Sequence, residues 1–198
     1  MKKKAFALFL ALALVVGGVV GGTVAWLTAT SATVTNTFTV GDVAITLTES
    51  PLKADGTYGD PGEGTENKYQ LIPGTEYKKD PTVTVTAGSE DCYLFVKFEE
   101  IGNASDYITY TSALTTGNGW TQGDGTTIPA NVWYRVVNKA DTIKSWNLLV
   151  DDKIVINADA VTKDTMTAAS GAKLQYTAYA VQKDNVADAA TAWAKVTP

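Results

Sequence analysis

Polar and apolar side chains alternate in the segment that follows the apolar N-terminal region. Val34, Phe38 and Val40, together with one asparagine, fall on one face of an extended chain, and threonines fall on the other. A period of two is typical of a half-buried β-strand, and threonine favours strands because its β-branch restricts χ1. Gly41 and Asp42 interrupt the alternation, which indicates a bulge or a crossing between sheets. We therefore predict a first strand that ends at Val40.

Similar patterns predict further strands along the chain. The segment 92–99 is apolar on both faces at first, which indicates a central position in a sheet, and Lys173–Gln182 alternates strongly as the last strand. The other predicted strands are 43–47, 69–72 (closed by a turn at Pro73-Gly74), 82–86, 132–137, 146–150 and 153–156, with a short strand or turn at 107–110. Asp151 and Asp152 separate two of these strands as in a tight hairpin.

Loops and short helices account for most of the remaining chain. Glycine and proline are frequent in 51–67, and glycine is frequent in 117–125, which predicts surface loops. Helical propensity is found only in 187–195 and 163–169, and Trp193 is the expected docking residue of the first of these segments. Many short strands with almost no helix predict an all-β, jelly-roll-like β-sandwich with one or two short helices.

The first 25 residues have the features of an export signal. Three lysines precede an apolar run, and the small residues Thr23, Val24 and Ala25 close the segment. We expect cleavage between Ala25 and Trp26, which leaves residues 26–198 as one domain. The uncharged run is long enough to span a bilayer, so an uncleaved anchor is the alternative, although its glycines weaken it as a helix.

The net charge limits the partners that the chain can have. It is −5 for the whole sequence, and it becomes more negative once the three N-terminal lysines are removed. Nucleic acids and anionic membranes attract a basic surface, and the charges here are spread along the chain. We expect no nucleic-acid partner, and membrane contact only through the signal segment before cleavage.

Residue types that carry common enzyme chemistry are missing. The sequence has no histidine, which excludes HExxH metalloproteases, Ser-His-Asp triads and zinc sites built on imidazole. Its one cysteine, Cys92, cannot form an intrachain disulfide and has no histidine to activate it. We interpret Cys92 as a small buried residue, and we predict that the protein is not an enzyme.

Carboxylates offer two weaker candidates for chemistry. Loop aspartates could supply oxygen ligands to calcium, but the spacing of a calcium-binding loop is absent, so solvated carboxylates are favoured; these residues are Asp124, Asp141, Asp151 and Asp152. Glu99 and Glu100 could suggest a glycosidase pair. Neighbours on a strand point to opposite faces, however, and cannot flank one bond. No metal and no cofactor are therefore expected.

Tryptophans offer a possible ligand surface. Trp120, Trp133, Trp146 and Trp193 would form a carbohydrate-binding platform if they were exposed together. A large aromatic side chain in a strand is more often part of the core. The core interpretation is therefore favoured.

Several sequence blocks resemble the TasA/camelysin family of secreted bacterial matrix proteins. The blocks, in chain order, are the lysine-rich start, the Gly-Gly-Thr-x-Ala segment at 21–25, the run 34–45 (VTNTFTVGDVAI), Leu71-Ile-Pro-Gly74 before Lys79-Asp-Pro81, and 174–182. They cover the signal and about half of the mature chain. The Trp26-Leu27 start and the loop 51–67 depart from the family pattern.

The resemblance implies a function in assembly. Members of that family look like jelly-roll subunits that are released by a SipW-type signal peptidase and polymerise by donating an N-terminal strand to the next subunit. Here the donor strand would be 26–40, with Val34, Phe38 and Val40 entering the neighbour. Some relatives are called metalloproteases, and that activity is not carried over because histidine is absent.

The expected function is that of a secreted structural subunit of an extracellular biofilm-matrix fibre, with other copies of itself as partners. The alternative is a monomeric cell-surface adhesin or carbohydrate-binding β-sandwich module. A fibre subunit needs its first strand free to leave its own domain, whereas an adhesin keeps that strand paired at home.

Overall fold

A computed structural model describes residues 43–63 and 66–196 of the chain. Within these residues the protein is all-β, with three antiparallel sheets, three short α-helices and two 3-10 turns. The chain crosses repeatedly from one sheet to another, as in a jelly roll. The expected all-β sandwich is confirmed. The expected donor segment 26–40, including Val34, Phe38 and Val40, and the expected cleavage site at Ala25 and Trp26 lie outside the described residues.

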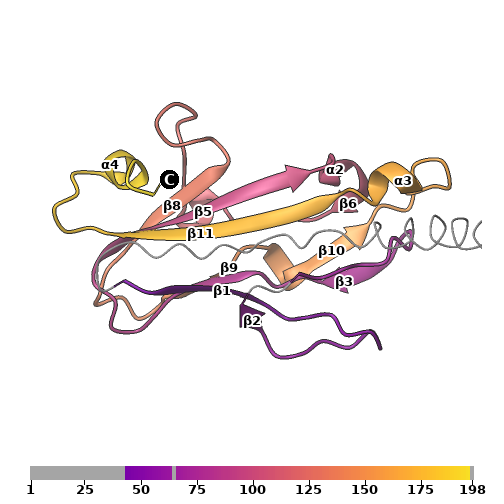
Figure 1. Ribbon diagram of the computed structural model, residues 1–198, viewed down its shortest axis with the longest axis horizontal. Helices are drawn as coiled ribbons and strands as arrows, with labels where there is room; N and C mark the ends of the chain where they lie inside the picture. The colour runs from indigo at the N-terminus through magenta and orange to yellow at the C-terminus, as the bar shows by residue number, and fades with distance from the viewer. Residues whose placement is uncertain (1–42, 64–65, 197–198) are drawn as a thin grey trace, which may run out of the picture. The chain divides into compact units, whose positions relative to one another are not determined.

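The largest sheet has the strand order β11-β5-β8-β7. Its strands are β5 (Cys92–Ile101), β7 (Thr121–Gln122), β8 (Val132–Val137) and β11 (Lys173–Gln182). β5 pairs with β11 along one edge and with β8 along the other, so its predicted central position is confirmed. In Figure 1, β11, β5 and β8 lie together above β9, β1 and β3.

Two smaller sheets complete the sandwich. One has the order β2-β1-β4-β9, and the other has the order β3-β10-β6. The strands are β1 (Ile45–Glu49), β2 (Gly62–Glu63), β3 (Glu76–Lys78), β4 (Thr82–Val85), β6 (Ile108–Thr109), β9 (Ser145–Asn147) and β10 (Lys153–Ile156). Alternation in β1 buries Ile45 and Leu47 and leaves Thr46 and Thr48 half-buried, as the sequence pattern predicts.

The main core collects apolar side chains from all three sheets. Leu94 and Val96 of β5 are fully buried in it, together with Val83 of β4 and Ile156 of β10. Side chains of this size contribute roughly 1.5–3 kcal/mol each on burial, so this cluster stabilises the packing of the three sheets.

A second cluster covers the opposite face of β5. Phe95 is fully buried there and contacts Trp193 of α4 (Ala189–Trp193), with ring centroids 5.2 Å apart. Asp188 caps this helix by accepting a hydrogen bond from the Thr191 N–H. The expected helix and its docking tryptophan are therefore confirmed. The second expected helix is α3 (Met166–Ala169), and α2 (Ala104–Tyr107) is an additional one that the sequence did not suggest.

The hairpin expected at Asp151 and Asp152 is wrong. β9 pairs with β4, whereas β10 pairs with β3 and β6 in another sheet. Both aspartates have positive φ, at 58° and 51°, in the turn that carries the chain between the two sheets. Aspartate tolerates this conformation. The sequence therefore predicted the turn correctly, but the strands on its two sides do not pair with each other.

The strand expected at 69–72 is also absent, although its closing turn is present. The Thr75 N–H donates to the Ile72 carbonyl at 3.0 Å, and Gly74 has a φ of 78°. A turn of this kind needs a residue that accepts positive φ. The extended pairing begins after the turn, in β3. The predicted loop 51–67 contains only β2 and one bridge, between Leu52 and Tyr58, among its described residues.

Candidate functional site: a strand edge and a buried polar network

The backbone of β11 presents one set of hydrogen-bonding groups that β5 does not use. The Lys183 N–H donates to the Asp91 carbonyl at 2.7 Å and continues the β11–β5 register. In an antiparallel strand the backbone groups of every second residue form hydrogen bonds with the same neighbouring strand. The backbone N–H and C=O groups of the odd-numbered residues of β11 therefore point toward β5. The N–H and C=O groups of Tyr176 and Ala178 therefore point away from β5, toward an edge where no strand of the described chain pairs.

Two of the inward-facing side chains of β11 beside this edge are small. Ala178 is fully buried, and Ala180 is 5% exposed, and both belong to the main core. They lie opposite Val96 and Leu94 of β5. Because alanine is short, larger side chains from a strand added at this edge can reach the core beside them.

β1 presents a similar edge. The Thr86 N–H donates to the Ala44 carbonyl at 2.8 Å, which continues the β1–β4 register. By the same alternation, the backbone groups of Ile45 and Leu47 point away from β4, and β2 pairs only with the end of β1. β1 and β11 are close neighbours in the sandwich (Figure 1). The two edges thus border the same part of the domain.

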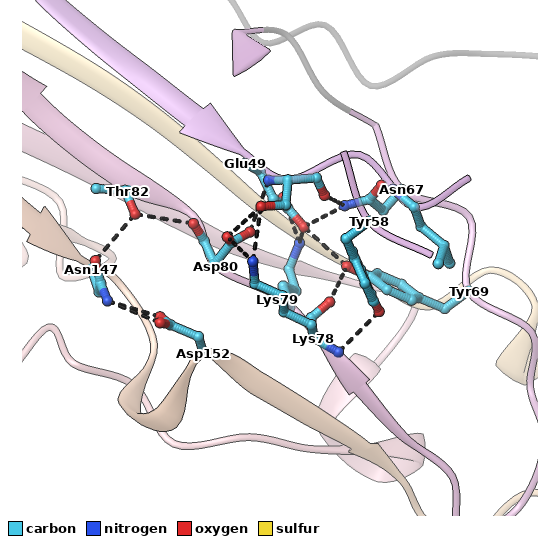
Figure 2. Close-up of polar contacts among 12 residues, drawn as sticks. Glu49, Tyr58, Asn67, Tyr69, Lys78, Lys79, Asp80, Thr82, Asn147 and Asp152 are labelled. Carbon is cyan, nitrogen blue, oxygen red and sulfur yellow. Dashed lines mark hydrogen bonds and ion pairs between the residues drawn. The ribbon is translucent and has the colours of Figure 1, made fainter. Parts of the chain in front are cut away.

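A buried ion pair lies at the end of β1. Lys79 Nζ is 3.1 Å from Glu49 Oε2 and 3.2 Å from Oε1, and their side chains are 9% and 11% exposed. Figure 2 shows this pair at the centre of a network that joins β1, the segment after β3 and the loop that follows β1. Removing one partner of such a pair leaves a buried charge and costs about 3–5 kcal/mol.

Asn67 and Tyr69 surround the Glu49 carboxylate. Asn67 Nδ2 donates to Glu49 Oε1 at 2.8 Å, and the Tyr69 hydroxyl lies 3.0 Å from the same oxygen. The Leu52 N–H donates to Asn67 Oδ1 at 2.6 Å. Burial and the nearby Glu49 charge raise the pKa of Tyr69 well above its ordinary value, so Tyr69 stays neutral.

A second, more exposed branch of the network centres on Asp80. This carboxylate accepts hydrogen bonds from the Ser50 N–H at 2.8 Å and the Ser50 hydroxyl at 2.6 Å, and it pairs with Lys78 at 2.9 Å. Burial acts to raise the pKa of Asp80, but the hydrogen bonds from Ser50 and the pairing with Lys78 together outweigh it, and the pKa is lowered. Beyond Asp80, Asn147 Nδ2 donates to Asp152 at 3.0 Å (Figure 2).

Sequence reasoning did not identify this network. Its one available signal was in β1, where Glu49 falls on the same inward face as Ile45 and Leu47. A charged residue in a buried series requires a partner, which here is Lys79. Asn67 gave no signal because it lies at the end of a loop rich in glycine and proline.

The tryptophans do not form one exposed platform. Trp120 is 2% exposed and Trp193 is 9% exposed. Trp120 packs edge-to-face on Trp146, with ring centroids 6.2 Å apart, whereas Trp193 lies in the second cluster and Trp133 packs against the main core. The core interpretation is confirmed for Trp120 and Trp193.

The other candidate residues have structural partners. Glu99 pairs with Lys97, and Glu100 accepts hydrogen bonds from the Tyr110 hydroxyl and the Ser105 N–H, so the two glutamates face opposite ways as expected. Cys92 is fully buried, and burial raises its pKa to about 11. Such a thiol remains protonated, as expected for a structural residue.

The loop aspartates are dispersed. Asp124 accepts hydrogen bonds from the N–H groups of the three residues 126–128, and Asp141 accepts one from the Asn138 N–H. In the part of the chain that the structure describes, no three histidine, cysteine or acidic side chains gather as metal ligands. Over the same residues, no helix is both long and apolar enough to cross a membrane.

Comparison with known proteins adds no further information about function. No protein-family model, no curated protein and no solved structure matches the chain.

Proposed function

We propose that the mature chain, residues 26–198, is a secreted structural subunit of an extracellular, biofilm-matrix fibre. In this proposal, a SipW-type signal peptidase removes residues 1–25, and each subunit then donates strand 26–40 to the next copy. The observation that carries the proposal is the edge of β11 at Tyr176 and Ala178, where outward backbone groups lie beside the buried side chains of Ala178 and Ala180.

The donor segment and the β11 edge have complementary patterns. Val34, Phe38 and Val40 alternate with threonines, so one face of the segment is apolar and the other is polar. Pairing with β11 would place the apolar face toward Ala178 in the core. Burying three such side chains contributes roughly 1.5–3 kcal/mol each, which offsets much of the entropy lost on association.

A proline pair tests whether the β11 edge accepts a strand. Ala178→Pro removes an N–H that points away from β5 and leaves the β5 ladder intact, because proline is tolerated on strand edges. Gln122→Pro is the matched control. It also removes an outward N–H, but from β7 at the opposite edge of the same sheet.

Electron microscopy of the two purified variants is the measurement. The proposal expects Ala178→Pro to form no fibres while keeping a β-rich circular dichroism spectrum, and Gln122→Pro to form fibres like the unmodified protein. Fibres from folded Ala178→Pro would contradict pairing at β11. A mature protein that stays monomeric at all concentrations would favour the adhesin or carbohydrate-binding alternative.

A further inference from the structure

Glu49, which is buried, brings the amine of the buried Lys79 together with the amide of the half-buried Asn67. Lys79 Nζ and Asn67 Nδ2 both contact the same atom, Glu49 Oε1, at 3.2 Å and 2.8 Å. The two nitrogen atoms are therefore separated by no more than the sum of these distances. An amine, an amide and a carboxylate in this arrangement are the reactants and the acid-base catalyst of an amide exchange.

We propose that Lys79 and Asn67 become joined by an isopeptide bond, and that Glu49 catalyses its formation. The inference does not depend on the proposed fibre function. It assigns a covalent modification to a site whose ion pair and hydrogen bonds would otherwise serve only stability.

The reaction balances without any other reagent. Lys79 passes a proton to Glu49, and the neutral amine attacks Cγ of Asn67, so that the electron pair of the C=O bond moves to Oδ1. Glu49 then protonates Nδ2, and the Cγ–Nδ2 bond breaks as the electron pair on Oδ1 returns. Ammonia leaves, one of the two protons still on Nζ passes to the Glu49 carboxylate, and the other stays as the N–H of the new amide. The products are one secondary amide and one ammonia molecule.

The surroundings support each part of this reaction. The Leu52 N–H, 2.6 Å from Asn67 Oδ1, lies where negative charge develops on the tetrahedral intermediate. Tyr69 covers the site, because its hydroxyl contacts Glu49 and its ring centroid lies 5.9 Å from Lys79 Nζ. The attack requires Nζ to approach Cγ within roughly 3–3.5 Å, and the shared contact with Glu49 Oε1 keeps the two side chains near each other.

The adjacent lysine provides an internal comparison. Lys78 Nζ contacts Ser50 Oγ at 3.0 Å and Asp80 at 2.9 Å, and its side chain is 45% exposed. It therefore has a carboxylate but no amide, and it is open to water. The proposed reaction should select Lys79 over Lys78, although the two residues are neighbours in sequence.

Mass spectrometry of the purified protein tests the proposal. The intact mass is expected to be lower than the sequence mass by one ammonia molecule, and proteolysis should yield a branched peptide that links Asn67 to Lys79. If the folded protein, without any substitution, has the full mass of its sequence, the proposal is overturned. A deficit that maps to a succinimide at an unlinked asparagine would also overturn it.

Three substitutions assign the roles. Lys79→Arg and Glu49→Gln should each restore the full mass, because the first removes the nucleophile and the second removes the proton acceptor. Lys78→Arg is the matched control and should keep the deficit and the branched peptide. A branched peptide that survives Glu49→Gln would contradict the catalytic role of Glu49. The mass of the protein without substitutions shows whether the bond exists, even if these variants fold poorly.

Discussion

Arg135 places its guanidinium 4.2 Å from the ring centroid of Trp146. The guanidinium carbon also lies 5.0 Å from the ring centroid of Trp120. Gly119 leaves room for the Arg135 side chain, because it has no Cβ to meet the guanidinium. A cation close to two indole rings is stabilised by their electron-rich faces. This arrangement explains why a charged side chain can lie on the core side of β8.

Replacing Arg135 by alanine should lower the free energy of unfolding by about 2–3 kcal/mol, because both ring contacts and the packing of the side-chain stem are lost. Urea denaturation monitored by tryptophan fluorescence measures this loss. Lys195→Ala, at an exposed position in the turn after α4, is the control and should change stability by less than about 0.5 kcal/mol. Equal effects of the two substitutions would contradict the role of the ring contacts.

Cys92 should be structural. Cys92→Ser is expected to lower stability by roughly 1–3 kcal/mol, because it buries a hydroxyl in place of a thiol in the main core. The variant should still assemble, and reducing agent should not dissolve the assemblies of the unmodified protein. Fibres that dissolve in reductant would show that a disulfide between subunits holds them together.

Acid should destabilise the loop that follows β7, because it protonates the Asp124 carboxylate. Three backbone hydrogen bonds lower the pKa of Asp124 from 3.8 to about 2. A carboxylate with a depressed folded-state pKa stabilises the protein above its unfolded pKa, and this contribution is lost as the pH falls from 3.8 toward 2. Asp124→Asn should therefore flatten the fall of melting temperature over this window. An unchanged pH profile in the variant would contradict the assignment.

The mature chain should begin at Trp26. The small residues Thr23, Val24 and Ala25 fit a signal peptidase site directly after the apolar segment. The mass and the N-terminal sequence of the secreted protein measure this boundary. Recovery of the chain in the membrane fraction with residues 1–25 attached would instead support the anchor interpretation.

Local patterns predicted the elements better than they predicted the partners. β8 and β11 have the predicted bounds, because alternation over six or ten residues is a property of the strand itself. The pairing of β9 with β4 depends instead on contacts far apart in sequence, so Asp151 and Asp152 suggested a hairpin that does not form.

The site shows the same division. The alternation in Lys173–Gln182 identified β11 as a strong strand, but its place at the edge of a sheet depends on how all the strands assemble. The Glu49–Lys79 pair joins residues 30 positions apart, and no local pattern encodes such a contact. Only the charged residue at an inward position of β1 pointed to it.

Deletion of residues 26–40 from the mature chain tests the fibre proposal most directly. The complete mature protein should form fibres visible by electron microscopy. The truncated protein should stay monomeric at the same concentration, keep a β-rich circular dichroism spectrum, and bind a synthetic peptide of residues 26–40. Fibres formed by the truncated protein under these conditions would contradict donation of the N-terminal strand.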